Sequence, residues 1–329
     1  MKIKIISQKE VAKAVSMAEA IRAVRNSYIQ LSEGKAGVPL RSHLEVTKTK
    51  GTALFMPGYL SESDALGVKT VTVFPDNPKR KLPTIYATIL VLDTETGQPL
   101  ALIEGTYLTA LRTGAASGVA TDLLARREAR VAAVFGAGVQ ARTQLEAVCT
   151  VRPIEKVWVY DIKRKKAEKF AQEMRNKESL PSDVSAASTP SQAVSEADII
   201  CTATTSFNPV FDDKDLKPGV HINGIGSYAP EMTEIPAPTV ARARVVVDSI
   251  KAALSEAGDL IVPLRKGLIS EDHIQAEIGE VAAGKKKVRE GTQEITFFKS
   301  VGIAVQDVAV AELVLRRSMD LKLGVEVEI

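Results

Sequence analysis

The stretch Val131-Ala-Ala-Val-Phe-Gly136-Ala-Gly138-Val-Gln-Ala141 decides the fold that the sequence predicts. It consists of a buried strand that runs into the pattern G-x-G-x-x-A and then into a helix. Gly136 would make the tight turn, Gly138 would let the backbone approach a pyrophosphate, and Ala141 would let the helix pack closely on the sheet. The start of the helix offers free N–H groups and a partial positive charge to the phosphates. The stretch therefore predicts a dinucleotide-binding βαβ unit.

An acidic residue follows the second predicted strand of this unit. Residues 157–160 form a short apolar run, and Asp161 after it is placed to hydrogen-bond the adenosine ribose hydroxyls of a dinucleotide. Lys163 and Arg164 are typical of a solvated helix face, although either could tolerate a 2′-phosphate. Because Asp161 would repel that phosphate, the sequence favours NAD(H) and leaves NADP(H) open. The alternative is an ordinary βα turn that binds no nucleotide.

Short apolar runs with helical segments or long connections between them are typical of a parallel, doubly wound sheet. The runs are residues 131–135, 157–160, 198–203, 220–225 and 245–248. Ligands of such sheets bind beyond the carboxyl ends of the strands, so the loops at residues 201–205 and 223–228 are expected to border the cofactor. Simple turn chemistry is the alternative explanation of both loops.

The residues before this sheet have a different pattern. The first ~35 residues are expected to be helical, with a capping box at Ser16-Met-Ala-Glu19 and Gly34 at the end of the helix. Apolar runs separated by turns predict an antiparallel sheet, and helical patterns return later in the chain. The runs are residues 52–56, 66–74, 84–93 and 99–104, and the helical segments are residues 108–124 and 306–317. We therefore expect two domains, with the first boundary near residues 118–130.

Composition excludes several classes of protein. The 329 residues include 43 Lys and Arg against 40 Asp and Glu, and this net charge of +3 is too balanced for a dedicated nucleic-acid binder. No stretch approaches the ~20 apolar residues that span a bilayer, and the N-terminus lacks the apolar core of a signal peptide. Two cysteines and three histidines offer neither a disulfide framework nor a zinc site. We expect a cytoplasmic, metal-free protein that binds neither nucleic acid nor a membrane.

Three basic residues in the first part of the chain stand in mainly apolar surroundings. They are Arg41 after Val-Pro-Leu, Lys69 after Leu-Gly-Val, and Arg112 between Leu111 and Thr113. A cation in such a place is normally paired with a carboxylate or serves an anionic ligand. The sequence leaves both explanations open for each of the three.

Several motifs occur together in a fixed order. The stretch EGTYLTALRTGAAS at residues 104–117 precedes the glycine loop, and HINGIG at residues 221–226 and SVGIAVQD at residues 300–307 follow it. This order and spacing resembles the ornithine cyclodeaminase/mu-crystallin family over nearly the whole chain. That family includes cyclodeaminases, archaeal-type alanine dehydrogenases, ketimine and pyrroline-carboxylate reductases, and opine-like synthases.

The resemblance implies an α/β protein in which a Rossmann dinucleotide-binding domain is inserted in an α+β dimerisation and substrate domain. We expect residues 1–118 plus 313–329 to form the dimerisation and substrate domain and residues 119–312 to form the Rossmann NAD(P)-binding domain. The resemblance also implies a homodimer, an active site between the two domains, and a small amino or imino acid as the substrate.

The resemblance also assigns roles to individual residues. Arg41, Lys69 and Arg112 are similar to the cluster that holds the substrate carboxylate and polarises the reacting carbon, and we take them as catalytic and substrate-binding. Tyr228 and Val301 are further substrate-binding candidates. The cofactor contacts implied by the resemblance are Thr84, Arg112, Thr113, Val139, Gln140, Asp161, Thr202, Asn223, Ile225 and Ser300, beside Gly136 and Gly138 of the glycine loop.

Two departures from the cyclodeaminase pattern decide which reaction we expect. Cyclodeaminases carry an aspartate where this chain has Gly226-Ser-Tyr228-Ala-Pro230, and an acidic residue just before the Met-Pro pair, where this chain has Phe55. Both losses weigh against ring closure of ornithine. We expect an NAD(P)H-dependent oxidoreductase that reduces a small cyclic imino acid such as 1-pyrroline-2-carboxylate, or that interconverts pyruvate and alanine. The alternatives are an ornithine cyclodeaminase and a non-enzymatic ligand-binding protein like mu-crystallin.

Overall fold

The computed structural model describes residues 1–175, 177 and 179–329, and it divides into two compact units. Unit 1 is Met1–Arg112 with Ile303–Ile329, and unit 2 is Thr113–Gly302. The sequence placed the divisions at 118/119 and 312/313, which lie inside helices α3 (Gly105–Leu124) and α11 (Ala304–Asp320). The observed divisions differ for a reason that the sequence pattern does not show. Helix α11 packs on β4, β5 and β6 and so belongs to unit 1, whereas the part of α3 after Arg112 is hydrogen-bonded to Gln144 and Asn223 and so belongs to unit 2.

Unit 1 is built on a mixed sheet. The strand order is β16-β1-β7-β6-β5-β4-β2, with β3 also paired to β4. The strands are β1 (Lys2–Ile6), β2 (Ala36–Gly37), β3 (Ser42–Val46), β4 (Gly51–Leu60), β5 (Ala65–Val73), β6 (Ile85–Leu92), β7 (Pro99–Glu104) and β16 (Val325–Glu328). Neighbours from β3 to β7 are antiparallel, as the sequence predicted, whereas β1 lies parallel to β7.

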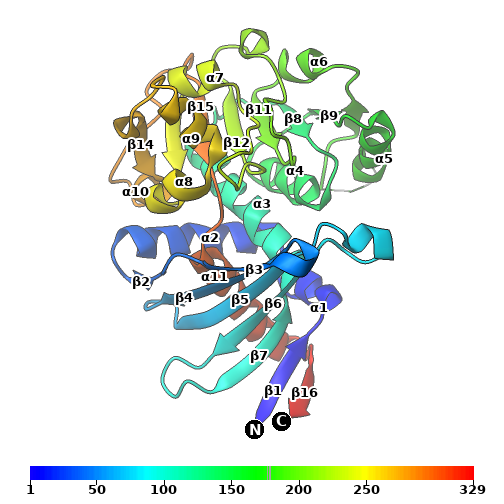
Figure 1. Ribbon diagram of the computed structural model, residues 1–329, viewed down its shortest axis with the longest axis vertical. Helices are drawn as coiled ribbons and strands as arrows, with labels where there is room; N and C mark the ends of the chain where they lie inside the picture. The colour runs from blue at the N-terminus through cyan, green and yellow to red at the C-terminus, as the bar shows by residue number, and fades with distance from the viewer. Residues whose placement is uncertain (176, 178) are drawn as a thin grey trace. The chain divides into compact units, whose positions relative to one another are not determined.

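The two ends of the chain contain strands that the sequence analysis missed. Residues Lys2–Ile6 were expected to be helical, but their alternation of Lys and Ile is a strand pattern, and β1 pairs with both β7 and β16. Figure 1 shows the two termini side by side, and the Met1 amino group donates to the Ile329 carbonyl at 2.8 Å. The expected single helix is therefore a strand followed by two helices, α1 (Gln8–Ala14) and α2 (Met17–Ser32).

Helix α2 begins where the capping box predicted. The Ser16 side chain accepts from the Glu19 N–H at 3.3 Å, and the Glu19 carboxylate accepts from the Ser16 N–H at 3.0 Å. Gly34 follows the helix with φ +73°, a backbone conformation that favours glycine. Helix α2 lies against α11, and α11 covers β4, β5 and β6. The face of β5 beneath α11 carries a lysine, Lys69, among small and apolar side chains.

Unit 2 has the doubly wound parallel sheet that the glycine loop predicted. Its strand order is β10-β9-β8-β11-β12-β15-β13-β14, and every neighbouring pair is parallel. The strands are β8 (Val131–Phe135), β9 (Lys156–Tyr160), β10 (Asp183–Ala186), β11 (Ile199–Thr202), β12 (His221–Gly224), β13 (Arg244–Val247), β14 (Ile274–Glu277) and β15 (Thr296–Lys299). Sequence patterns gave five of these and missed β10, β14 and β15, each only four residues long.

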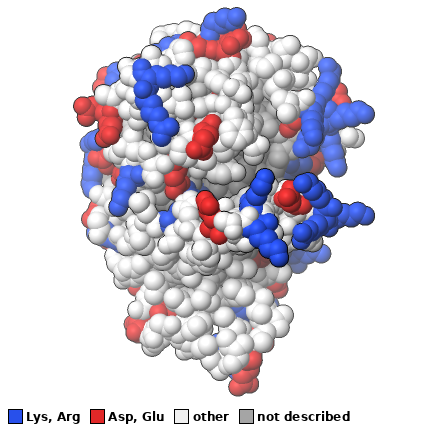
Figure 2. Space-filling view, in the orientation of Figure 1, with Lys and Arg blue, Asp and Glu red and all other residues white. Residues whose placement is uncertain are grey.

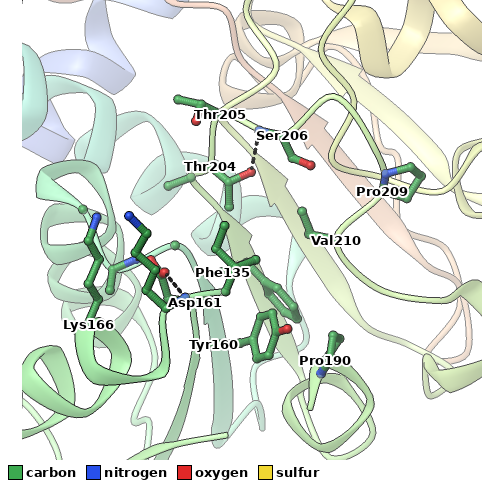
Figure 3. A pocket seen from close by; sticks show the side chains of 16 residues that line it. Phe135, Tyr160, Asp161, Lys166, Pro190, Thr204, Thr205, Ser206, Pro209 and Val210 are labelled. Carbon is green, nitrogen blue, oxygen red and sulfur yellow. Dashed lines mark hydrogen bonds between the residues drawn. The ribbon is translucent and has the colours of Figure 1, made fainter. Parts of the chain in front are cut away.

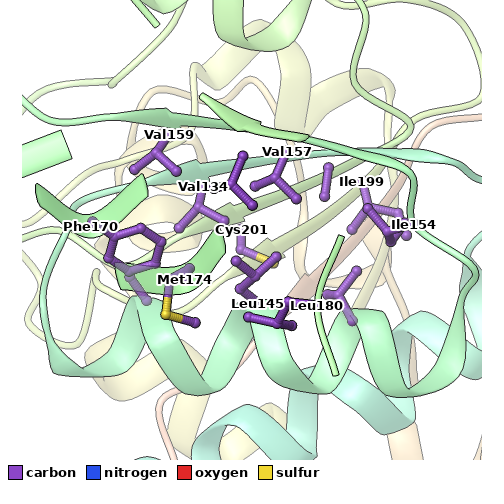
Figure 4. Packing of buried hydrophobic residues seen from close by; sticks show 14 of the residues in the cluster. Val134, Leu145, Ile154, Val157, Val159, Phe170, Met174, Leu180, Ile199 and Cys201 are labelled. Carbon is purple, nitrogen blue, oxygen red and sulfur yellow. The ribbon is translucent and has the colours of Figure 1, made fainter. Parts of the chain in front are cut away.

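Helices occupy the connections between these strands. They are α4 (Val139–Val151), α5 (Arg164–Arg175), α6 (Pro190–Val194), α7 (Ala237–Arg242), α8 (Ile250–Glu256), α9 (Gly258–Arg265) and α10 (Ile278–Ala282). Figure 4 shows Leu145 of α4 and Phe170 and Met174 of α5 packed against Val134 and Val159 of the sheet. This apolar layer packs α4 and α5 against one face of the sheet.

Helix α3 is almost entirely buried, and small residues let it lie close to its neighbours. A Cβ atom added to Gly114 would lie 2.4 Å from the carbonyl oxygen of Thr143 in α4, so only glycine permits this approach. Among the described residues, no helix is long and apolar enough to cross a membrane. On the face drawn in Figure 2, basic and acidic side chains are interspersed, as the small net charge of +3 leads one to expect.

Candidate functional site

A pocket of about 640 Å³ opens at the carboxyl ends of β8, β9 and β11 (Figure 3). The chain passes from β8 to β9 on one side, and β11 lies on the other side of β8, so the pocket sits where the strand order reverses. This reversal point is where open parallel sheets bind their ligands. The lining consists of residues 135–138 after β8, residues 160–163 and Lys166 near β9, Pro190, and residues 203–206, 209 and 210 after β11.

The glycine loop has the geometry that a pyrophosphate requires. Gly136 has φ +88° and donates its N–H to the Tyr160 carbonyl at 2.8 Å, and an added Cβ would lie 2.7 Å from the Ala203 carbonyl oxygen. Gly138 differs, because an added Cβ there would meet no atom of the described residues within 4 Å. It lines the pocket and directly precedes α4, and the first N–H groups of a helix have no partner within the helix. The loop is therefore an open cradle at a helix N-terminus and fits a dinucleotide.

Asp161 lies at the edge of this pocket. Its two carboxylate oxygens accept hydrogen bonds from the Ala137 N–H at 3.0 Å and the Lys163 N–H at 2.8 Å, which fixes the side chain beside the glycine loop (Figure 3). Lys163 and Lys166 line the pocket, whereas the Arg164 guanidinium pairs with Glu168 at 2.9 Å. A fixed carboxylate suits a ribose diol and opposes a 2′-phosphate, so the geometry favours NAD(H).

Other predicted cofactor contacts have side chains that the fold already uses. The Thr202 hydroxyl donates to Glu234 at 2.9 Å, and the Asn223 amide donates to the Thr121 hydroxyl at 3.0 Å. Asn223 also faces His221, whose imidazole is neutral because burial lowers its pKa to about 3. Both predicted residues are fully buried. Because these side chains are already hydrogen-bonded within the protein, only the backbone groups of the two residues remain for contact with a cofactor.

Glu234, which the sequence analysis did not single out, holds two loops of unit 2 together. One carboxylate oxygen accepts from the Thr204 N–H and the other from the Gly226 N–H, both at 2.6 Å. These N–H groups belong to the loops after β11 and β12. Burial and the nearby Asp259 raise the pKa of the Glu234 carboxyl. No sequence pattern reveals this clamp, since Glu234 lies in an irregular segment and Thr204 is 30 residues away in the chain.

The remaining predicted residues of unit 2 are placed as follows. Asp248 at the end of β13 accepts from the Ser300 hydroxyl at 2.8 Å and from the Val301 N–H at 3.0 Å, so both residues are held by one buried carboxylate. Tyr228 is 46% exposed, and burial of its ring raises the pKa of the phenol.

Four further predicted cofactor contacts follow. Val139 is exposed at the start of α4 with Gln140 after it, Ile225 donates its N–H to Thr202, and the Thr113 carbonyl accepts from Gln144 at 3.1 Å.

Unit 1 contains a second cluster of functional character, formed by the three predicted cations and a carboxylate. Lys69 of β5 and Arg112 of α3 are both buried and both pair with Asp307 of α11. The Lys69 Nζ atom lies 2.8 Å from Asp307 Oδ2, and Arg112 Nε lies 2.9 Å from Oδ1. Arg41, between β2 and β3, is near enough for its charge to act on Lys69. Thr84 is also in unit 1, where its carbonyl accepts from the Phe74 N–H at 2.8 Å.

The electrostatics of this cluster favour an anionic ligand. Burial is the largest influence on the Lys69 ammonium, followed by the charge of Arg112, and together they lower its pKa to about 7 despite the opposing effect of Asp307. Arg41 lowers the pKa further. Because Lys69 and Arg112 share one carboxylate, positive charge remains when the lysine is protonated. A carboxylate of a small molecule would neutralise that charge.

The sequence analysis quoted the stretch that contains Asp307 but gave the residue no role. A local signal exists: Asp307 and Gln306 interrupt a run of apolar residues in α11, and a carboxylate among buried apolar side chains is normally paired. The identity of its partners, Lys69 and Arg112, is a matter of tertiary structure.

Comparison with known proteins identifies the family of the chain. The sequence model of the ornithine cyclodeaminase/mu-crystallin family matches residues 1–321. The Δ1-pyrroline-2-carboxylate reductase of Bacillus cereus (strain ZK / E33L) is 44% identical, with 98% of this chain and 99% of the relative covered. The structure of Thermococcus litoralis Δ1-pyrroline-2-carboxylate reductase in complex with NADH and L-proline is 46% identical with a TM-score of 0.95, covering 99% of this chain and 100% of that chain. An archaeal alanine dehydrogenase dimer with bound NAD is 36% identical with a TM-score of 0.93, and both chains are fully covered.

We expect Gly138→Val to weaken NADH binding by about tenfold or more, a loss of roughly 1.4 kcal/mol. The branched side chain would fill the cradle at the start of α4, while the backbone, with φ −87°, accepts any residue. Fluorescence titration with NADH measures the dissociation constant. Gly291→Val is the matched control, because a Cβ there makes ordinary contacts outside the pocket. A folded Gly138→Val variant that binds NADH like the parent would remove the glycine loop from the cofactor site.

Proposed function

We propose, because the chain belongs to the ornithine cyclodeaminase/mu-crystallin family, that it is an NAD(H)-dependent oxidoreductase that reduces the C=N bond of a small cyclic imino acid. The leading substrate is 1-pyrroline-2-carboxylate, and the product would be proline. The observation that carries the proposal is the buried Lys69–Asp307–Arg112 cluster, in a chain that also has a dinucleotide pocket. The two similar pyrroline-2-carboxylate reductases support this substrate.

Arg112 is the proposed anchor of the substrate carboxylate. Its guanidinium is held by Asp307 through Nε, so the group has a fixed orientation when the ligand arrives. Charge-assisted hydrogen bonds from such a group orient the imine carbon, and orientation of this kind lowers a barrier by several kcal/mol. The charge of Arg41, which acts on Lys69, adds to the positive charge of the cluster. Bound NADH supplies the hydride that the imine carbon receives.

Lys69 is the proposed source of the proton that the imine nitrogen gains. A lysine whose pKa is lowered to about 7 exchanges a proton readily near neutral pH, which an exposed lysine does not. Asp307, 2.8 Å from the ammonium, stabilises the protonated form before transfer. In the reverse direction the neutral amine would accept the proton from the amino acid.

The structure supports the ornithine cyclodeaminase and the non-enzymatic ligand-binding protein less well. Ornithine cyclisation needs a base for the protons of the substrate's side-chain amine, and the Tyr228 phenol, whose pKa is raised by burial, is neutral at pH 7. Phe55, the other departure, is exposed and carries no charge, and its neighbour Met56 of β4 pairs directly with Lys69 of β5, so an apolar thioether lies beside the lysine. A pure ligand-binding protein has no use for a lysine tuned to neutral pH. Interconversion of pyruvate and alanine is a second candidate, supported by the similar archaeal alanine dehydrogenase.

Three reactions run in parallel test the proposed function. We expect 1-pyrroline-2-carboxylate with NADH to give proline and to consume NADH, followed by its absorbance at 340 nm, a general property of the cofactor. Pyruvate and ammonia with NADH test the alanine dehydrogenase reaction. Ornithine with NAD tests the cyclodeaminase: proline and ammonia in that vessel, with no NADH consumed in the others, would overturn the proposal. Absence of turnover in all three would favour the ligand-binding protein.

The lowered pKa of Lys69 predicts a pH dependence of opposite sense in the two directions. Reduction needs the ammonium, so kcat/KM for the imino acid should fall as the pH rises through about 7. Oxidation of the amino acid needs the neutral amine, so its kcat/KM should rise over the same interval. In Lys69→Arg the group stays charged throughout, and we expect lower activity without this inflection. Parent and variant profiles of the same shape would exclude Lys69 as the titrating group.

We further propose that the protein forms a homodimer through the sheet face of unit 1 that α2 and α11 leave uncovered. An antiparallel sheet with one solvated face normally alternates between apolar and polar side chains. Here part of the face that points away from the helices is also apolar, and Thr70, Thr72 and Thr88 continue the same face beyond it. The apolar residues, which lie opposite one another in neighbouring strands, are Pro57, Tyr59, Leu66, Val68, Leu90 and Leu102. Contiguous apolar surface of this kind marks a protein interface. A second copy is the chosen partner because the similar alanine dehydrogenase is a dimer.

We expect Leu90→Glu to convert the dimer into a monomer, because two carboxylates would be buried in the interface. Light scattering coupled to size-exclusion chromatography gives the mass. Leu268→Glu makes the same chemical change at a 52% exposed leucine of unit 2 and should leave the mass unchanged. If the parent is a monomer at micromolar concentration, or if Leu90→Glu stays dimeric, this sheet face is not the interface.

A further inference from the structure

A buried tyrosine of α2 is linked to the cation cluster through one glutamine. Tyr28 is 1% exposed, and Gln306 is fully buried in the first turn of α11, next to Asp307. The Gln306 Nε2 group donates to the Tyr28 hydroxyl oxygen, and Gln306 Oε1 accepts from Arg112 Nη1. The Ile303 N–H also donates to Oε1, at 3.3 Å. None of these residues except Arg112 was singled out from the sequence.

The chemistry of the three groups permits only one arrangement of the amide. A guanidinium has donors and no acceptor, so the Gln306 oxygen must face Arg112. The Gln306 NH2 group then faces Tyr28, whose oxygen is the acceptor that it needs. If the amide turned over, its NH2 group would face the donors of Arg112 and Ile303. Tyr28 thus stabilises the orientation in which Gln306 holds the arginine.

The contacts fix the plane of the Arg112 guanidinium at two points. Asp307 engages Nε and Gln306 engages Nη1. The Nη2 group, which neither of them engages, is directed by the rigid planar geometry of the guanidinium once the other two nitrogens are held. We propose that Tyr28 and Gln306 are positioning residues that aim Arg112 at the substrate carboxylate. This inference rests on the proposed function, in which Arg112 binds that carboxylate.

A neutral amide suits this position better than a carboxylate would. Lys69 and Arg112 already share Asp307, and a second carboxylate at position 306 would cancel the positive charge that attracts the ligand. The groups that act on Lys69 are Asp307 of α11, Arg112 of α3 and Arg41, while the strands on either side of β5 place Met56 and Ile89 opposite it. An added negative charge would therefore stabilise the Lys69 ammonium and move its titration to higher pH.

The test compares Tyr28→Phe with Ser27→Ala, and it uses pyrrole-2-carboxylate, a flat unreactive carboxylate, as the probe. Ser27 is an equally buried hydroxyl on the same helix, but its hydroxyl donates only to the Val24 carbonyl in the hydrogen bonds of this structure. We expect Tyr28→Phe to weaken probe binding and to raise KM for the imino acid by about 3- to 10-fold, the range for one hydrogen bond. kcat should change less than KM, the NADH dissociation constant should not change, and Ser27→Ala should behave like the parent.

A double-mutant cycle with Arg112→Lys decides whether Tyr28 acts through the arginine. If it does, adding Tyr28→Phe to Arg112→Lys should change probe binding by less than about twofold. Additive losses would overturn the inference, and so would an equal loss in Ser27→Ala. If Arg112→Lys alone leaves both probe binding and kcat/KM unchanged, the carboxylate anchor of the proposed function fails instead.

Gln306→Glu gives a second and independent reading, which also serves if Tyr28→Phe does not fold. The carboxylate keeps an acceptor for Arg112 but adds a negative charge to the cluster. We expect weaker probe binding by about tenfold and a pH–rate inflection displaced upward from that of the parent. A variant with unchanged affinity and an unchanged inflection would overturn the role given to Gln306.

Discussion

The carboxylate of Asp307 lies between the Lys69 ammonium and the Arg112 guanidinium, and the chemistry of the protein depends on this shared contact. Two buried cations side by side repel each other, and each loses most of its hydration. The Asp307 carboxylate reduces the repulsion between Lys69 and Arg112 but does not neutralise both charges. It joins a strand, β5, to two helices, α3 and α11, that are far apart in the sequence. Within unit 1, α11 also packs against α2 and against β4, β5 and β6.

One carboxylate against two cations leaves the cluster incompletely neutralised, unlike an ordinary structural ion pair. With a second carboxylate the cluster would be a closed salt bridge, and Lys69 would stay protonated at neutral pH. With one carboxylate the lysine titrates near 7 and the arginine retains capacity for an anion. Phe55, next to Met56 in β4, is exposed on the opposite face of the sheet, so the apolar side chain beside Lys69 is that of Met56.

How far the sequence predicts the structure depends on how local each determinant is. The glycine loop, the capping box at Ser16 and the antiparallel strands are determined by interactions among residues close together in the sequence. The structure contains each of them as predicted. Strand β15 was missed although β11, β12 and β13, which also have four residues each, were predicted, and β1 was hidden by the helices after it. The contacts of Glu234 with Thr204, and of Tyr28 with Gln306, join residues far apart in the chain. A single sequence shows that such buried polar residues need partners, but the partners follow only from the tertiary structure.

The discontinuity of unit 1 has a consequence for how the protein folds during synthesis. Unit 2 is one uninterrupted segment, Thr113–Gly302, and can complete its sheet as soon as it leaves the ribosome. Unit 1 cannot, because α11 follows the whole of unit 2 in the chain, and Asp307 arrives with it. Until then the strand that carries Lys69 has neither its covering helix nor its counter-ion. The N-terminal half must therefore remain an incomplete sheet until α11, the last long helix, completes its core and brings Asp307 to Lys69 and Arg112.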